Sequence, residues 1–137
     1  QGGSGGAVMQ FVEAFNALGF SLANQRQDWS AETDAGICIS LWTKETDWKT
    51  LVMDTRIHAG DPAMWKHKLG NAKRARHARR ALEEFGGWVD VVKIDGVPGE
   101  SFGQATPWNP VERKGFQWKV TFLDDETGHL RLEALSR

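Results

Sequence analysis

Apolar positions recur with two different periods along this chain, and the periods divide it into helical and strand segments. From Val8 to Leu18, apolar residues repeat at i, i+3, i+4, i+7 and i+10, the spacing of an amphipathic helix, and Gly19 follows. Alternating or β-branched runs predict strands at 37–42, 48–54, 88–94, 116–123 and 129–135. We expect the first two of these strands to form an antiparallel hairpin through the polar turn at 44–47.

Two stretches carry no convincing period. Residues 20–28 offer at most a short edge strand, and residues 97–115 contain three prolines without a repeat. Long irregular segments are uncommon in compact domains and are often functional or disordered. The polar run 124–128 is typical of a hairpin turn between the last two strands.

The central stretch, Asp61 to Gly87, has a helical composition. Gly70 and Asn71 suit a helix end followed by an N-cap, which predicts a short helix at 62–69 and a second at 72–85. A single kinked helix is the alternative. The second helix has a narrow apolar stripe formed by Ala75, Ala78, Leu82 and Phe85.

These elements predict one α+β domain over residues 7–137. We expect a mostly antiparallel sheet of about five strands, packed with the N-terminal helix and the basic central helical segment. Residues 1–6 (QGGSGG) are small and polar, and we interpret them as a linker or a cloning scar. A chain of 137 residues that is 40% hydrophobic and 26% charged matches an ordinary globular domain.

Charge is distributed unevenly. The window 66–80 holds seven Lys or Arg residues and no acid, whereas the whole chain has a net charge of -1, so the remainder carries -8. Positive charge clustered on one helix is the electrostatic footprint of phosphate binding, but a solvated face that pairs with acids elsewhere in the fold explains it equally well. The candidate phosphate-binding residues are Arg56, Lys73, Arg74, Arg76, His77, Arg79 and Arg80.

Tryptophan is abundant, with seven residues and no tyrosine. Flat indole rings can stack on bases. Two modes of nucleic-acid binding follow. In one, the basic helix enters the DNA major groove with Arg76 and Arg80 at base edges. In the other, the helix grips the backbone while Trp108, Trp42 or Trp48 holds an unstacked or flipped base, and the Trp content favours this mode.

Signals for catalysis are weak. The single cysteine, Cys38, excludes an internal disulfide and a cysteine-based zinc site, and the scattered histidines predict no metal centre. Asp90, Lys93 and Asp95 do not match the acid-x-Lys spacing of metal-dependent nucleases. We therefore expect no cofactor, no metal and no catalytic residue, and we lean against an enzyme.

The sequence favours a nucleic-acid-binding module, with DNA ahead of RNA, that reads a modified, flipped or single-stranded base. The alternative is a protein-interaction or regulatory domain whose basic patch docks an acidic partner. Either module could belong to a larger multidomain protein. With no long apolar run and no signal-peptide pattern, we expect no membrane partner and a cytoplasmic location.

Overall fold

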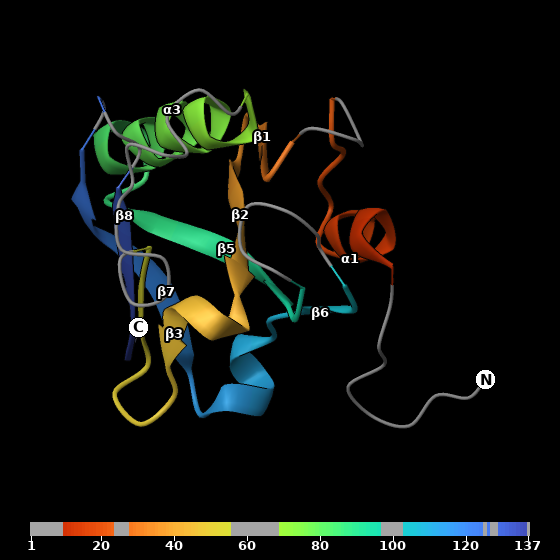
Figure 1. The fold of residues 1–137 in the computed structure, drawn as a ribbon, viewed down its shortest axis with the longest axis vertical. Helices are drawn as coiled ribbons and strands as arrows, with labels where there is room; N and C mark the ends of the chain where they lie inside the picture. Colours follow the sequence, from red (N-terminus) through yellow and green to blue (C-terminus); the bar gives the residue numbers. More distant parts are fainter. Residues whose placement is uncertain are drawn as a thin grey trace.

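The computed structural model describes residues 10–23, 28–55, 69–96, 103–124, 126 and 129–136. These residues form an α+β domain in which helices pack on a mostly antiparallel sheet (Figure 1), as the sequence predicted. The helices are α1 (Phe11–Ala17) and α3 (Leu69–Glu84), with 3-10 turns η1 (Thr43–Glu45) and η3 (Pro110–Arg113). The strands are β1 (Ser30–Thr33), β2 (Gly36–Trp42), β3 (Thr46–Asp47), β4 (Val52–Asp54), β5 (Trp88–Ile94), β6 (Ala105–Pro107), β7 (Phe116–Leu123) and β8 (Leu130–Ser136).

The sheet has eight strands rather than about five: seven follow the order β1-β2-β5-β7-β8-β4-β3, and β6 pairs with β5 off this path. Strands β2 and β5 are parallel, and the other pairs are antiparallel. Strand β5 is central because it also pairs with β7 at its first residues and with β6 at its last. The predicted strands at 88–94 and 116–123 are therefore confirmed.

The predicted hairpin between 37–42 and 48–54 is wrong. After β2 the chain enters η1, where the Thr46 hydroxyl donates a hydrogen bond to the carbonyl of Trp42. A tight turn follows, because the Asp47 carboxylate accepts from the backbone N–H groups of Lys49 and Thr50. After this turn β4 pairs with β8 instead of β2, and β2 pairs with β1 and β5. Strand β1 itself has no clear alternation and was missed in the sequence.

Helix α3 is continuous through Gly70 and Asn71, so these residues do not separate two helices there. Most of the predicted helix at 62–69 lies outside the described residues. The apolar stripe is confirmed: Ala75 and Ala78 are buried, and Leu82 and Phe85 pack partly buried against the core. Small alanine side chains let the helix lie close to the sheet.

Helix α1 covers Phe11–Ala17 of the predicted 8–18, and residues 8 and 9 lie outside the described range. It begins at a capping box in which the Glu13 carboxylate accepts from the N–H of Gln10. Gly19 follows the helix with φ of 88°, a left-handed conformation that glycine adopts easily. The helix packs beside β6, at the other side of the sheet from α3 (Figure 1).

Two apolar clusters form the core, and both use β2 and β5. Ile37, Ile39 and Leu41 of β2 join the cluster that contains Ala78 and Ala81 of α3. The alternate side chains of β2 join the cluster around α1, where Phe11, Phe15, Cys38 and Trp42 are buried. The two central strands are therefore covered on both faces, which explains their β-branched composition.

The C-terminal strands depart from simple alternation. A register shift between Val120 and Phe122 in the pairing of β7 with β8 leaves Phe122 46% exposed. Leu123 packs against the core. His129 is buried and its Nε2 lies 2.8 Å from an Asp54 carboxylate oxygen. Leu130 and Leu132 are fully buried.

Candidate functional site

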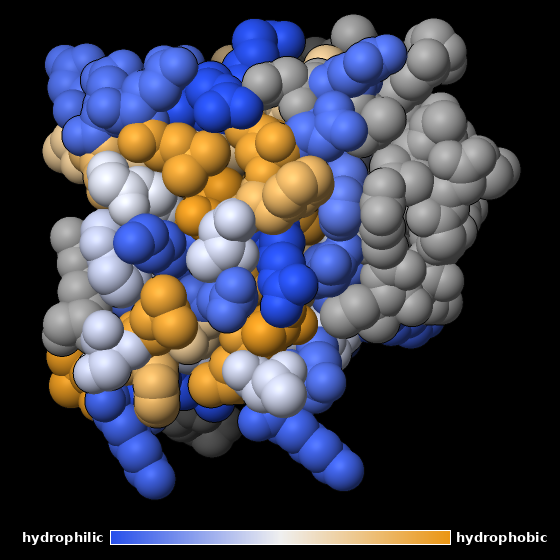
Figure 2. Space-filling view, turned by 90° about the vertical axis from the view of Figure 1, so that its left-hand side faces the viewer, coloured by the Kyte–Doolittle hydropathy of each residue, from blue (hydrophilic) through white to orange (hydrophobic). Residues whose placement is uncertain are grey.

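Two cations on the basic face of α3, Lys73 and Arg80, form ion pairs with acids of the segment that leads into β1, of β1 itself and of α3. The Lys73 ammonium lies 2.9 and 3.0 Å from the two carboxylate oxygens of Asp28, which is buried. Arg80 pairs with Glu32 at 3.0 Å and with Glu84 at 3.1 Å. Lys73 and Arg80 therefore match the second interpretation of this helix, in which its basic face pairs with acids elsewhere in the fold. Figure 2 shows hydrophilic residues gathered over the α3 edge of the molecule.

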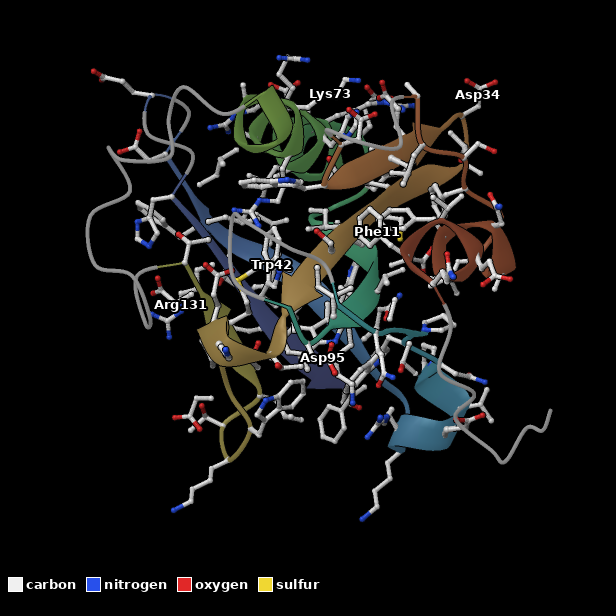
Figure 3. The ribbon with its side chains drawn as sticks, turned by 45° about the vertical axis from the view of Figure 1, so that its right-hand side comes forward. Phe11, Asp34, Trp42, Lys73, Asp95 and Arg131 are labelled. Carbon is white, nitrogen blue, oxygen red and sulfur yellow. The ribbon has the colours of Figure 1, made fainter. Side chains whose placement is uncertain are left out.

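Arg74 is fully buried rather than presented to a partner. Its guanidinium lies 5.0 Å from the ring centroid of Trp29 and 5.7 Å from that of Trp42. Figure 3 shows Trp42 beneath α3, with Lys73 at the top of the helix. Trp42 is also buried, so neither it nor Arg74 can contact an external ligand in this conformation.

Glu45 of η1 is the buried acid that interacts with Arg74. Burial, partly offset by the Arg74 charge and reinforced by Asp54, raises the pKa of the Glu45 carboxyl to about 7. Desolvation lowers the pKa of Arg74, and the Glu45 charge acts in the opposite direction. Neither side chain has a hydrogen-bond partner for its buried charged atoms within the described part of the chain. This pair is a polar element inside the fold that the sequence did not indicate.

His77 also serves the α3–β1 contact. Its Nδ1 lies 2.6 Å from the Ser30 hydroxyl, and its Nε2 lies 3.5 Å from a Glu32 carboxylate oxygen. Desolvation is the main reason that the pKa of His77 is lowered, which keeps the ring neutral at pH 7. The order serine, histidine, acid resembles a catalytic relay, but Ser30 is 1% exposed and no substrate can reach its hydroxyl here.

Of the remaining predicted cations, the structure places two. Arg76 is exposed on α3 and has no ion pair with the described residues, whereas Arg79 is half-buried. Arg56 lies outside the described residues. Of the helix cations that the structure places, Arg76 is thus the best suited to contact a phosphate.

A second cationic surface lies at the opposite end of the molecule from α3. Trp48, in the turn between β3 and β4, is 41% exposed, and its indole N–H donates to the carbonyl of Thr43. The Lys93 ammonium of β5 lies 5.4 Å from the Trp48 ring centroid. The sequence identified Trp48 as a stacking candidate but missed Lys93. A lysine near the end of a mostly apolar strand was the available signal.

Trp108 lies next to this lysine across β6. Thr106 of β6 pairs with Lys93 of β5, and Thr106 lines both a hollow of about 230 Å³ beside Lys93 and a pocket of about 340 Å³ under Trp108. Trp108 is buried, donates its indole N–H to the carbonyl of Phe116, and carries the Arg113 guanidinium 4.6 Å from its ring centroid. We call Trp48, Lys93, Thr106, Trp108 and Arg113 the Lys93 surface.

The cations of the Lys93 surface are close enough to influence each other. Desolvation is the main cause of the lowered pKa of Lys93, the Arg113 charge lowers it further, and Asp95 opposes both. Figure 3 places Asp95 between the β3–β4 hairpin and the η3 segment. This surface combines positive charge, one exposed indole and a pocket of ligand size.

Other site types have little support in the described residues. There, no group of three or more His, Cys, Asp or Glu residues is arranged to hold a metal ion. No helix in the described ranges is both long and apolar enough to cross a bilayer. Burial and the nearby Asp90 carboxylate raise the pKa of the Cys38 thiol, which disfavours the reactive thiolate.

Comparisons with known proteins add no assignment. No protein-family model matches the chain, and no curated protein or solved structure matches it either.

Proposed function

We propose that this domain binds single-stranded or locally unpaired nucleic acid through the Lys93 surface. The observation that carries the proposal is the exposed Trp48 ring with the Lys93 ammonium beside it. Proteins that bind single strands combine cations for the phosphate backbone with aromatic faces on which bases stack. Arg113, close enough to Lys93 to lower its pKa, supplies a second cation on the same surface.

The ion pairs on α3 are the reason to prefer this surface to the basic helix. Phosphates would have to compete with Asp28 for Lys73 and with Glu32 and Glu84 for Arg80. The Asp28 carboxylate is buried, which makes its pair with Lys73 the harder one to replace. Arg76 is left as an accessory phosphate contact.

The proposal is tested by oligonucleotide binding with variants of the Lys93 surface. Labelled single-stranded DNA, single-stranded RNA and duplex DNA are titrated with protein at several salt concentrations, with anisotropy as the readout. We expect single strands to bind most tightly, with affinity falling linearly on a log–log plot against salt. Trp48→Ala should weaken binding about five- to hundredfold, because stacking contributes roughly 1–3 kcal/mol per base, and Trp48→Phe should retain part of the affinity.

Lys119→Ala is the matched control for Lys93→Ala. Lys119 also lies over an indole, 5.5 Å from the Trp88 ring centroid, but it pairs with Trp88 at the other end of β5. Lys93→Ala should reduce the magnitude of the salt slope by about one, and Lys119→Ala should leave it unchanged. Equal effects of the two variants, or no binding at low salt, would refute the proposal. Polyglutamate binding as tightly as the oligonucleotides would favour an acidic protein partner instead.

A further inference from the structure

The pocket under Trp108 has the composition of a small polar recognition site. It has a volume of about 340 Å³, at the lower end of the range for small-molecule sites. The end of α1 and strand β6 form its apolar walls, and polar side chains of β5 and the η3 segment line the rest. Its charged residues are two acids, Asp90 and Glu112, and one cation, Arg113.

Asp90 is held in place by its neighbours. It lies on β5, where it pairs with Cys38 of β2, and one of its carboxylate oxygens accepts a hydrogen bond from the Gln117 side-chain amide at 3.0 Å. Asp90 is partly buried and is one of the residues that line the pocket. An ionised carboxylate accepts hydrogen bonds and donates none, so this wall selects for a ligand with N–H groups.

Arg113 gives the pocket a flat cationic edge. Its guanidinium covers the ring of Trp108, and that ring also makes an edge contact with Trp118, with the ring centroids 5.4 Å apart. A planar ligand can stack on an arginine guanidinium as it stacks on an aromatic ring. The Arg113 charge also lowers the pKa of Lys93, so Arg113 belongs both to the pocket lining and to the Lys93 surface.

We propose that this pocket takes one unstacked base with an exocyclic amino group, cytosine above uracil, and that Asp90 accepts the hydrogen bond from that amino group. The inference rests on the proposed binding of unpaired nucleic acid. Carboxylates accept from the cytosine N4 amino group, whereas the O4 carbonyl of uracil would meet the carboxylate as a second acceptor and be repelled. Asp90 is therefore the residue that reads the base, and Lys93 and Arg113 hold the strand.

The test compares oligo(dC) with oligo(dU), which differ only in the ring edge that the pocket would read. We expect the protein to bind oligo(dC) roughly tenfold more tightly. Asp90→Asn should abolish or reverse this preference, because an amide can donate to O4, while its carbonyl oxygen still accepts from Gln117. Glu83→Gln, at an exposed carboxylate on α3, is the charge-matched control and should keep the preference. Thermal melting confirms that both variants fold.

The outcomes separate this inference from the proposed function. Failure of both oligonucleotides to bind would refute the proposed function and this inference with it. Equal binding of oligo(dC) and oligo(dU), or a preference that Asp90→Asn leaves intact, would overturn the base reading alone. Loss of the preference in Asp90→Asn but not in Glu83→Gln would support it.

Discussion

At the scale of single residues, side chains of one type have opposite environments. Trp42 and Trp48 are six positions apart, yet Trp42 is 1% exposed and Trp48 is 41% exposed. Arg74 and Arg76 are neighbours on one helix, and only Arg76 reaches solvent. The residue list predicted from sequence therefore mixed core residues with surface residues, since residue type does not specify burial.

Because Glu45 is buried with a raised pKa, we expect the free energy of unfolding to depend on pH. Its pKa is raised from 4.5 to about 7 in the folded protein, so the folded state holds a proton that the unfolded state releases between these values. Stability from this group is therefore present below pH 4.5 and is lost as pH rises toward 7, on the order of 3 kcal/mol in total. Glu45→Gln should remove this loss, measured by urea unfolding from pH 5 to pH 8.

Wild type must be compared with Glu45→Gln because His77 titrates in the same pH range and its effect on stability has the opposite sign. Its pKa is lowered in the fold, so its contribution to stability is gained as pH rises through its unfolded value of 6.5. Subtracting the variant from the wild type cancels this term. A difference in unfolding free energy that stays constant with pH would show that Glu45 does not retain its proton.

At the scale of elements, the helical spacing of α3 was predicted correctly, although the helix is continuous where a break was expected at Gly70 and Asn71. Its apolar stripe follows from helical spacing, and the stripe is the face that contacts the core. The partners of its basic residues were not predictable, because Asp28 and Glu32 come from a segment about 45 residues earlier. Only the packing of α3 against β1 brings these charges together.

Close packing of α3 predicts a large effect of a small change. Ala78 is fully buried and belongs to the apolar cluster shared with the sheet. Ala78→Leu should destabilise the domain by about 1–3 kcal/mol, because extra methylenes force the helix away from the sheet. Glu83→Leu, on the exposed side of the same helix, should change stability by less than about 0.5 kcal/mol. Denaturant unfolding measures both variants, and equal effects would show that α3 packs differently.

At the scale of the whole molecule, the β3–β4 hairpin and η3, which carry Trp48 and Arg113, lie at the opposite end from α3 (Figure 1). The described cations of α3 are therefore separate from the surface through which we propose binding. The fold places Trp48, Lys93 and Arg113 together from β3–β4, β5 and η3, which are distant along the chain.

This separation predicts which charge reversals affect binding. Arg113→Glu should weaken binding of a short single strand at least tenfold, because it replaces a phosphate-attracting charge beside Lys93 with a repelling one. Arg76→Glu, at the opposite end, should weaken it less than threefold. Anisotropy titrations at fixed salt compare the two variants. The reverse ranking would return the phosphate contacts to α3.

The sequence by itself determined the α+β class, the strands at 37–42, 88–94 and 116–123, and the buried stripe of α3. These features depend on local periodicity, which determines the face that each element buries. Only the tertiary structure decided the other features: the partners of β2, the neutralisation of Lys73 and Arg80, the burial of Arg74 beside Glu45, and the pairing of Trp48 with Lys93. Each joins residues from separate elements, and periodicity within one element carries no information about which element packs beside it.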